Sequence, residues 1–502
     1  MLSSTALSVL SLATLWLDPI SAAPGSNPGC TALKKAFPDQ TFSPKDPVYE
    51  YESQDFWSNN EILNPACVFR PSSAQHVSNA VKVMGASRTA FGLRGGGHMA
   101  IAGANNIDNG PLFAMSNLTT LELSKDKKSV WVGPGLDWGQ VYRYLGQYKL
   151  ACAGGRLSPV GVPGLLLGGG INFHGNQRGW AADNVLEYEL VLSSGKTVSV
   201  TSKSYPDLFW ALKGGSNNFG IVTKFKLATF PSDQIYAGVY SVTDIPGFLK
   251  AVANFSAFNT DPLAHIVPQV VAVDEKTTIG AAILFYDSDS NPEPDCFRPF
   301  FDLATISNTF KKQTLAEFSD ETGQLVTPNI NDQFIAGTTT GKTYEEILEG
   351  IQIVNDGFLN ALPDLYKVLP AENRKLITVD WQPIGSLWAK ASKNFNPGGN
   401  ALGLDVESKG TYIAWAEVVE WSGDEHNDAV FKWIEDTTWA IANATQKAGL
   451  YDPFYYMGDA AGFQNIYDGY GQKNKQKLLQ ISRKYDPLRI FQSYSECFLS
   501  QE

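Results

Sequence analysis

Hydrophobic residues in the first half of the chain alternate between helical and strand-like spacing. Apolar side chains recur at i, i+3, i+4 and i+7 after Ser72, which predicts a helix, and Ser72-x-x-Gln75 resembles a capping box at its start. The apolar positions of this helix are Val77, Ala80, Val81 and Met84. Further strands are predicted at 129–132, 188–192, 196–200 and 217–227, with a hairpin between 188–192 and 196–200 around Ser194-Gly195, and further helices at 141–148 and 207–213. This βαβ-like alternation, with glycines at the junctions, indicates a mixed helix and sheet fold.

The middle of the chain, from about residue 233 to 453, carries longer patterned segments. Strands are predicted at 265–273, 277–286 and 411–421, and helices at 345–362 and 429–448. Long strands with interspersed helices favour an α+β domain. On the strand 411–421, Glu417 and Glu420 are three positions apart, so they face opposite sides and at most one points inward.

The N-terminal segment 1–22 is predicted to be a secretory signal peptide. An apolar run from Ala6 to Leu17 is too short to span a bilayer, and small residues follow it at 21–23. We therefore expect a secreted, extracellular protein. Later in the chain, no stretch has the pattern of a transmembrane helix.

Secretion makes disulfides and N-glycans expected features. The five cysteines are Cys30, Cys67, Cys152, Cys296 and Cys497. An odd number leaves at least one thiol free; the preferred pair is Cys30–Cys67, and the states of the other three stay open. The three N-x-S/T sequons begin at Asn117, Asn254 and Asn443. No C-x-x-C occurs and there are only five histidines, so no metal site is expected.

The composition is that of a globular protein with a large core. Of 502 residues, 43% are hydrophobic and 18% are charged. The net charge of −12 argues against nucleic acid or an anionic membrane as a partner. Aromatic residues make up 12% of the chain, enough both to fill a core and to line a pocket for an organic substrate.

Two glycine clusters are the strongest candidates for chemistry. The first, Arg94-Gly95-Gly96-Gly97-His98-Met99, lets backbone N–H groups approach an anion closely, and His98 follows at once. The second runs from Gly161 to Gly170. Either cluster alone is most often a tight turn, but together they favour a bound nucleotide cofactor, with His98 a candidate for a covalent link to it.

An ordered set of further motifs accompanies these clusters. They are Arg94–His98, Val160–Gly164 with Gly168–Gly170, Ala182–Val185, Asp207–Leu212, Phe219–Thr223, Tyr470-Gly471-x-x-Asn474 and Lys484–Pro487. In this order and spacing, the chain resembles the FAD-linked oxidases of the vanillyl-alcohol oxidase and berberine-bridge-enzyme-like superfamily, with a PCMH-type FAD-binding domain. The sequence is most similar in character to the secreted fungal members, and the resemblance runs from about Cys30 to about Gln492.

The resemblance implies an α+β fold in which a two-part FAD-binding domain joins an antiparallel-sheet substrate domain covered by helices. Residues 28–232 would form the FAD domain and 454–502 would complete it, while 233–453 would bind the substrate. His98 occupies the position of the covalent histidine, which links to the flavin 8α carbon. The residues implied to bind FAD are Arg94, Gly95, Gly96, Gly97, His98, Met99, Gly161, Gly164, Gly168, Gly169, Asn172, Gly220, Ile221, Val222, Tyr470 and Asn474.

Two positions modify this expectation. Leu157 stands where many relatives carry a second tethering cysteine, and Cys152 lies five residues too early, so a single link at His98 is predicted. Because double tethering goes with open clefts for bulky sugars, Leu157 also disfavours a carbohydrate oxidase. Val160 stands where members that react with oxygen tend to have a small residue, which favours an oxidase over a dehydrogenase.

Four residues are candidates for catalysis. Gln382 matches a strand over the reactive side of the flavin, where it would orient substrate or serve only as a strand hydrogen bond. Tyr456 is a candidate base or hydrogen-bond donor, although Gly458 replaces the usual asparagine of that segment. His174 is either a base facing the pocket or a structural histidine, and Asp459 either a catalytic or a surface carboxylate.

The function implied is that of a secreted FAD-dependent oxidase. It would pass a hydride from a small organic substrate, such as a natural product, to covalently bound FAD, with O2 as the second substrate and H2O2 as a product. Two alternatives stay open: a carbohydrate or oligosaccharide oxidase, and a pericyclase in which FAD is structural. A Gly-x-Ser-x-Gly elbow is absent, so the sequence gives no support to a hydrolase.

Overall fold

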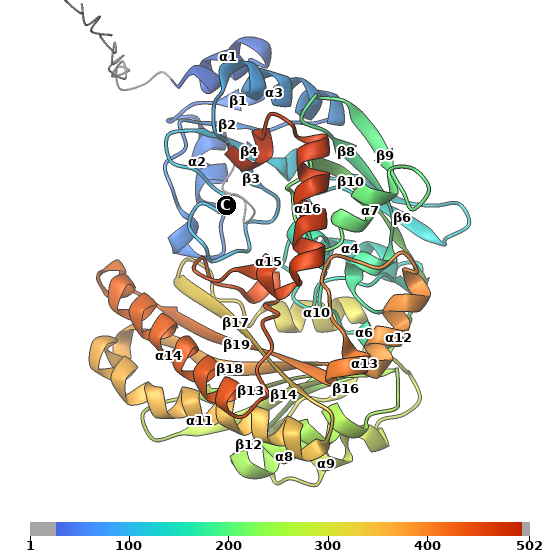
Figure 1. The fold of residues 1–502 in the computed structure, drawn as a ribbon, viewed down its shortest axis with the longest axis vertical. Coiled ribbons are helices and arrows are strands. Elements are labelled where there is room, and N and C mark those ends of the chain that lie inside the picture. Colours follow the sequence, from blue (N-terminus) through green and yellow to red (C-terminus); the bar gives the residue numbers. More distant parts are fainter. Residues whose placement is uncertain (1–26, 494–502) are drawn as a thin grey trace, which may run out of the picture.

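The computed structural model of the protein describes residues 27–493 (Figure 1). The predicted signal peptide and Cys497 lie outside this range. Among the residues described, no helix combines the length and the apolar character needed to cross a membrane.

The first part of the chain builds three small sheets. Their strand orders are β1-β2-β4-β3, β5-β6-β10-β8-β9 and β11-β7. The bounds are β1 Thr41–Phe42, β2 Cys67–Phe69, β3 Gly92–Arg94, β4 Pro111–Ala114, β5 Leu121–Leu123, β6 Ser129–Val132, β7 Leu150–Ala151, β8 Val185–Val191, β9 Thr197–Val200, β10 Ile221–Ala228 and β11 Phe230–Pro231. The helices between them are α1 Pro28–Ala36, α2 Pro47–Gln54, α3 Ala74–Ser87, α4 Trp138–Gly146, α5 Val162–Leu167, α6 Gly175–Arg178 and α7 Pro206–Ala211.

The predicted βαβ-like alternation holds for only one of these sheets. Strands β2 and β3 both pair in parallel with β4, and α3 connects them. In the five-stranded sheet, by contrast, β6 pairs antiparallel with β5 and β10, so the βαβ prediction is wrong for that strand. The hairpin around Ser194-Gly195 is confirmed, because β8 and β9 pair antiparallel and Gly195 in the turn between them has φ +75°.

The helix predicted after Ser72 is α3, and its stripe Val77, Ala80, Val81 and Met84 is fully buried. Its cap is one residue later than predicted. The Ser73 hydroxyl accepts the His76 N–H at 3.2 Å, whereas the Ser72 hydroxyl lies 3.2 Å from His76 Nδ1. Likewise α4 ends at Gly146, so Tyr148 lies beyond it and is exposed.

The preferred disulfide is confirmed. Cys30 on α1 is bonded to Cys67 on β2. Within the described residues Cys152 is a buried free thiol and Cys296 a half-buried one.

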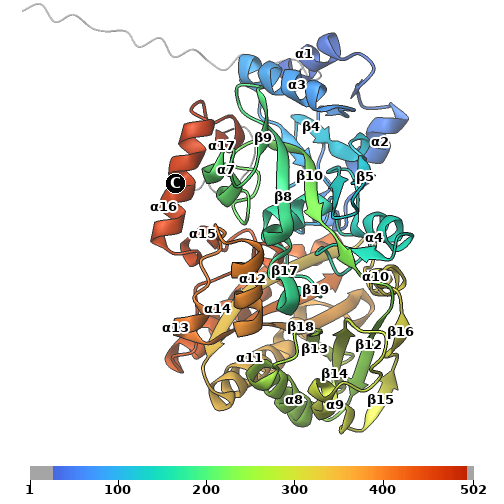
Figure 2. The same ribbon diagram turned by 90° about the vertical axis from the view of Figure 1, so that its right-hand side faces the viewer.

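The second part of the chain forms one large antiparallel sheet, whose order is β15-β12-β14-β13-β18-β19-β17, with β16 also paired to β12. The bounds are β12 Ile235–Val242, β13 Ala264–Ala272, β14 Thr278–Tyr286, β15 Thr305–Asn308, β16 Lys311–Gln313, β17 Asn331–Gly341, β18 Arg374–Ile384 and β19 Thr411–Trp421. Three long helices, α8 Ile245–Phe258, α11 Tyr344–Val368 and α14 Asn427–Lys447, cover one face, and the first part of the chain lies against the other (Figures 1 and 2).

Successive residues along each strand of this sheet point to opposite faces. Ile377, Val379 and Trp381 of β18 are buried in the core shared with α11 and α14. The alternate residues Thr378, Asp380 and Gln382 face the other way, toward the first part of the chain. The sheet is therefore anchored on its helical side and presents polar groups on the opposite side.

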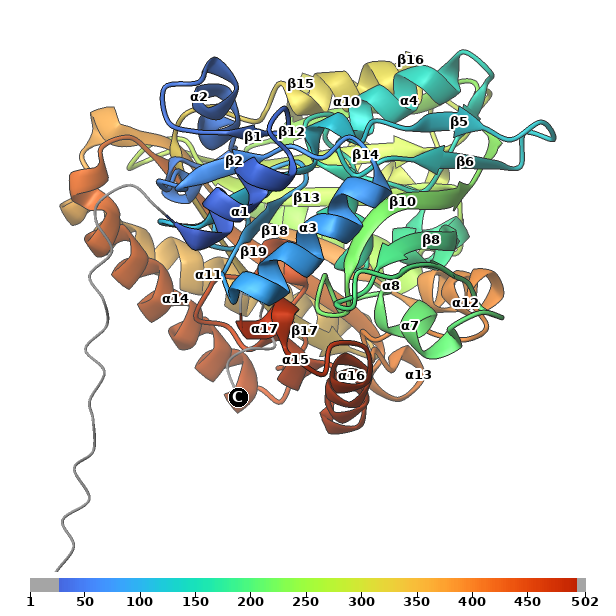
Figure 3. The ribbon, with the colours of Figure 1, turned by 90° about the horizontal axis from the view of Figure 1, so that it is seen from above.

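The C-terminal segment returns to the first part of the chain, as Figure 3 shows from above. It contains α15 Ile466–Gly469, α16 Gln472–Tyr485 and α17 Ile490–Ser493. Asp207 at the start of α7 accepts hydrogen bonds from Lys484 at 2.6 Å and from the Tyr485 hydroxyl at 2.9 Å. The domain limits given above remain predictions; in the structure, the chain passes from β11 to β12 near residue 232.

Candidate functional site

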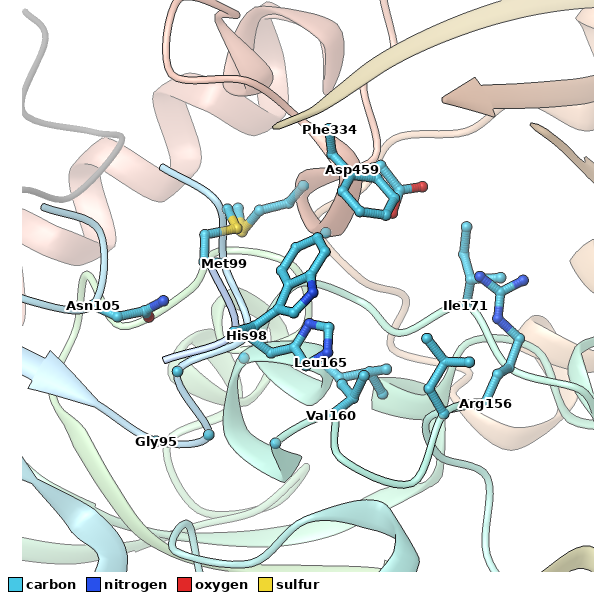
Figure 4. A pocket seen from close by; sticks show the side chains of 18 of the residues that line it. Gly95, His98, Met99, Asn105, Arg156, Val160, Leu165, Ile171, Phe334 and Asp459 are labelled. Carbon is cyan, nitrogen blue, oxygen red and sulfur yellow. The ribbon is translucent and has the colours of Figure 1, made fainter. Parts of the chain in front are cut away.

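A cavity of about 380 Å³ lies between the glycine loops and the polar face of the large sheet (Figure 4). This volume is in the usual range of small-molecule and cofactor sites. Its floor is formed by alternate residues of five strands: Ile283, Val267, Gln269, Leu376, Thr378, Asp380, Gln382, Val418, Glu420 and Phe334. Its walls come from segments that the chain places far apart: 93–99, 156–171, 216–222 and 456–459.

The two glycine clusters meet backbone to backbone in the cavity wall. A Cβ built on Gly96 would lie 2.4 Å from the Cα of Gly161, and one on Gly161 would lie 2.6 Å from the Cα of Gly96. Gly97 has φ +62°, a conformation that favours glycine. A Cβ on Gly164 would meet no atom within 4 Å, because it would point into open space. Close contact between the loops thus explains Gly96 and Gly161, and Gly164 is left free to approach a ligand.

His98 lies in the cavity wall, with its imidazole stacked on the Trp57 indole at 4.5 Å between ring centroids. Trp57 in turn contacts Phe334 of β17 at 5.3 Å. The imidazole is half-buried, but its Nε2 is inaccessible to solvent and has no hydrogen-bond partner among the described residues. Burial lowers the pKa of His98 to about 4, so that the ring is neutral at neutral pH. A neutral imidazole keeps a lone pair on one of its two ring nitrogens, and that lone pair can form a bond.

A polar cluster occupies the other end of the cavity. Arg156 donates to Gln382 Oε1 at 2.7 Å, and the Gln382 amide donates to Asp459 Oδ2 at 3.2 Å. Asp380 lies beside them on β18, and one of its oxygens is buried without a partner. Burial raises the pKa of both Asp380 and Asp459, the former also through the charge of the latter, while Arg156 opposes both shifts. The pair therefore holds and releases protons nearer neutrality than an exposed aspartate does.

Tyr456 completes this cluster. It is buried in the cavity wall, its ring stacks on Trp180, and its hydroxyl accepts the Ile171 N–H at 3.1 Å. Burial and the neighbouring Asp459 raise the pKa of the Tyr456 hydroxyl, so it is a hydrogen-bond donor rather than a phenolate. The cluster can orient a polar group of a ligand and exchange a proton with it.

The structure brings together twelve of the residues singled out from the sequence. The predicted cofactor-binding and catalytic residues that line the cavity are Gly95, Gly96, Gly97, His98, Met99, Gly161, Gly164, Ile221, Val222, Gln382, Tyr456 and Asp459. They come from both glycine clusters, from β10, from β18 and from the segment before α15.

Arg94 does not line the cavity. Its guanidinium is buried against α2, where it pairs with the Glu52 carboxylate and donates to the Asp55 carbonyl at 3.1 Å. The same Glu52 carboxylate forms a second ion pair, with 3.0 Å between its Oε1 and Arg70 Nε. Arg94 thus fixes the start of the glycine loop against α2, on the side away from the cavity.

Six other predicted cofactor residues also lie outside the cavity lining: Gly168, Gly169, Gly220, Asn172, Tyr470 and Asn474. The side chains of Tyr470, Asn474 and Asn172 donate hydrogen bonds to backbone carbonyl groups. The Tyr470 hydroxyl donates to the Gly214 carbonyl at 3.1 Å and the Asn474 amide to the Ala401 carbonyl at 3.2 Å. The Asn172 amide donates to the carbonyls of Gly170 and Gly179. These residues stabilise segments next to the cavity, and their contact with the cofactor stays a prediction.

His174 is a structural histidine and does not face the cavity. Its Nε2 lies 3.8 Å from Asp287 Oδ2, and its ring packs against Phe230 and Phe285. Burial is the main cause of its lowered pKa. His174 is therefore not placed to act as a base in this cavity.

Sequence reasoning missed Trp57, Arg156 and Asp380. Asp380 had a usable signal, because Ile377 to Gln382 alternates apolar and polar residues and so indicates a strand with one polar face. Trp57 and Arg156 lie in irregular segments, where no periodic pattern points to a site. Glu417 and Glu420 behave as expected: Glu420 lines the cavity and Glu417 is buried on the opposite face, near Thr438 of α14.

Sequence comparison identifies an FAD binding domain at residues 65–201. An FAD-dependent monooxygenase of Arthrobotrys oligospora is 33% identical over 92% of this chain and 87% of its own length. The FAD-dependent monooxygenase prx3 of Penicillium roqueforti is 30% identical over 92% of this chain and 91% of its own length.

Solved structures share the fold at lower identity. The 6-hydroxy-D-nicotine oxidase of Arthrobacter nicotinovorans superposes with a TM-score of 0.75 at 18% identity, covering 91% of this chain and 97% of its own. The glucooligosaccharide oxidase of Acremonium strictum, which carries 6-S-cysteinyl, 8α-N1-histidyl FAD, has a TM-score of 0.72 at 17% identity, covering 92% and 98%.

The cavity residues fit FAD. The close approach of the two glycine loops, the open space at Gly164 and the neutral His98 imidazole in the same wall are what a flat, phosphate-bearing cofactor requires. With the domain match and the full-length relatives, the chain belongs to the family of fungal FAD-dependent monooxygenases and is an FAD-dependent oxidoreductase, and its fold is that of the berberine-bridge-enzyme-like oxidases.

Proposed function

We propose that the protein is a secreted oxidase of small organic molecules that holds its FAD through one covalent bond to His98. The observation that carries this proposal is His98 itself: a neutral, solvent-shielded nitrogen in the wall of the cavity that fits the cofactor. A single bond follows from Leu157, which lines the same cavity and offers no thiol, whereas Cys152 is buried away from it.

Bound FAD supplies the hydride acceptor, and its reoxidation by O2 gives H2O2. The chain supplies the rest. Arg156 and Gln382 orient the polar group of the substrate, and the Asp380–Asp459 pair accepts the O–H or N–H proton that is released with the hydride. Tyr456 donates a hydrogen bond to the same group. Val160 leaves a small side chain in the wall, which favours access of O2.

The covalent bond is tested by purifying the protein from a secreting host and denaturing it in acid. We expect flavin fluorescence to stay with the chain, and mass spectrometry to find it on the peptide that contains His98. The variant His98→Ala should lose the flavin on denaturation, while Cys152→Ser should keep it. Flavin that washes off the wild-type chain would refute the proposal, as would a flavopeptide containing Cys152.

The oxidase activity is tested without knowledge of the substrate. We expect the dithionite-reduced enzyme, mixed with O2, to reoxidise much faster than free reduced flavin and to release one H2O2 per flavin. Slow reoxidation would contradict the oxidase proposal and favour a structural role for FAD, as in a pericyclase. Because the curated relatives are named monooxygenases, incorporation of labelled oxygen into a product is the outcome that would assign that activity instead.

Secretion and glycosylation belong to the same proposal. Asn117 and Asn443 have exposed side chains, and Asn254 on α8 is half-buried. We expect the secreted protein to lack residues 1–22 and to shift in mass on treatment with an N-glycosidase. An unchanged mass together with retention inside the host would contradict this part of the proposal.

A further inference from the structure

A second pair of carboxyl groups lies at the end of the cavity floor away from Asp459. Asp332 on β17 and Glu420 on β19 are directly opposite each other in the antiparallel register. Side chains of such a pair lie on the same face of the sheet with their Cβ atoms about 5 Å apart. Glu420 lines the cavity, and Phe334, two residues after Asp332, lines it as well. Both carboxyl groups therefore lie on the cavity side of the sheet, and Glu420 is the one that is part of the cavity lining.

These carboxyl groups are buried without a counter-charge. Asp332 has no exposed surface and Glu420 is 3% exposed. Both oxygens of Asp332 and Oε2 of Glu420 have no hydrogen-bond partner of ordinary geometry among the described residues. The two carboxyl groups are hydrogen-bonding neighbours of each other, the further groups beside them are the neutral hydroxyls of Ser58 and Thr327, and no basic side chain perturbs either carboxyl. Two carboxyls placed together in an apolar setting resist ionisation unless a cation reaches them.

The pair is separated from the Asp380–Asp459 pair by a mainly apolar stretch, in which the one hydroxyl, that of Thr378, donates to the Val270 carbonyl at 2.9 Å. Glu420 is aligned with Leu376 on β18, and Asp380 with Ala416 on β19. Four residues along a strand span about 13 Å. Leu376, Val418 and Phe334 line the cavity at the Glu420 end of this interval. The floor therefore offers two polar ends joined by a mainly apolar surface.

We propose that Asp332 and Glu420 form a subsite for a protonated amine on the substrate, so that the oxidised molecule is an elongated, mainly apolar organic cation. The ammonium supplies the positive charge and the N–H donors that the two carboxyls lack. The opposite end of the molecule then reaches Asp459 and Tyr456. This inference rests on the proposed function for what happens at that end, and it adds the chemical class of the substrate.

The test is calorimetric binding to the flavin-loaded protein with three probes: 4-phenylbutylamine, its neutral analogue 4-phenylbutan-1-ol, and cellobiose. We expect the amine to bind the wild type more tightly than the alcohol does. In Glu420→Gln and in Asp332→Asn, the Kd of the amine should rise at least about tenfold, while that of the alcohol stays within about twofold.

Glu417→Gln is the matched control. It removes an equally buried carboxyl from the same strand, but on the face turned toward the helices, and should leave the binding of the amine unchanged. Equal affinity of amine and alcohol for the wild type would overturn the proposal, and that comparison needs no variant. So would the absence of amine binding, an amine affinity insensitive to both substitutions, or a cellobiose affinity that depends on Glu420.

These outcomes are distinguishable from failure of the proposed function. Calorimetric binding does not require turnover or a covalent bond to His98. Flavin released by denaturation, or slow reoxidation, counts against the oxidase alone, whereas the probe affinities count for or against the subsite.

Discussion

Buried carboxyl groups are the residues whose chemistry differs most from that of their free forms. Glu417, on the helical face of β19, has the Thr438 hydroxyl of α14 beside it, but neither of its oxygens has a hydrogen bond of ordinary geometry among the described residues. Burial raises its pKa from 4.5 to about 8. The folded protein therefore holds this proton over a range of pH in which the unfolded chain has lost it.

The consequence is a pH-dependent stability. Below about pH 4.5 both states hold the proton, between 4.5 and about 8 only the folded state does, and the free energy of unfolding falls as pH rises through this window. We predict that Glu417→Gln removes this loss, so that the variant gains stability over the wild type by on the order of a few kcal/mol between about pH 5 and pH 8. Urea denaturation of the variant and the wild type at pH 5 and at pH 8 measures this difference in the free energy of unfolding. Glu122→Gln, an exposed position on β5, controls for the change of charge, and an equal difference at both pH values would contradict the prediction.

At the level of elements, the contact between the two glycine loops predicts different effects of one chemical change. Gly96→Ala would place a methyl group 2.4 Å from the Cα of Gly161, so we expect a loss of about 1–3 kcal/mol in the free energy of unfolding. Gly164→Ala adds the same methyl group within α5 where no atom of the chain lies within 4 Å, so we expect the fold to keep its stability while the methyl group, which points into the cavity, lowers the flavin content. Thermal unfolding and the ratio of flavin to protein absorbance of both variants check this, and equal destabilisation by the two would refute it.

The C-terminal segment gives a second prediction at this level. Tyr470→Phe removes the hydrogen bond to the Gly214 carbonyl and leaves that buried oxygen without it, so we expect a loss of about 1–3 kcal/mol with full flavin content. Denaturation and the ratio of flavin to protein absorbance measure the two quantities. Reduced flavin content at unchanged stability would instead place Tyr470 in contact with the cofactor.

The sequence predicts elements where their signal is local. The stripe Val77 to Met84 defines α3 because a helix satisfies its own backbone, and the turn at Gly195 defines the hairpin β8–β9 for a similar reason. Strand pairing is not local: β10 pairs with β6 and β8, and β17 with β19, across long stretches of chain. The antiparallel five-stranded sheet was therefore not predictable from spacing.

The same reasoning applies to the site. His98 and the glycines share short contiguous motifs, so the sequence finds them together. Arg156, Asp380 and Trp57 enter the cavity from separate segments, and only the fold brings them to it. Tyr470 and Asn474 show the converse case, because a motif next to a site can serve the backbone that supports it.

For the whole molecule, the disulfide is the one covalent bond that closes a loop at the start of the described chain. Cys30 and Cys67 are 37 residues apart, so breaking the bond frees a sizeable loop in the unfolded state. We predict that Cys30→Ser with Cys67→Ser lowers the free energy of unfolding by about 2–4 kcal/mol without changing the spectrum of bound flavin. Cys296→Ser, a thiol outside any disulfide, is the control. Unaltered stability of the double variant would contradict the prediction.

The alternation of side chains across the large sheet has a consequence for how such a protein can diversify. Thr378, Asp380 and Gln382 look into the cavity, whereas their neighbours Ile377, Val379 and Trp381 hold the helices. A substitution at one set leaves the contacts of the other nearly untouched. Substitutions on the cavity face can accordingly change the substrate specificity one position at a time, while Ile377, Val379 and Trp381 keep the sheet packed against its helices.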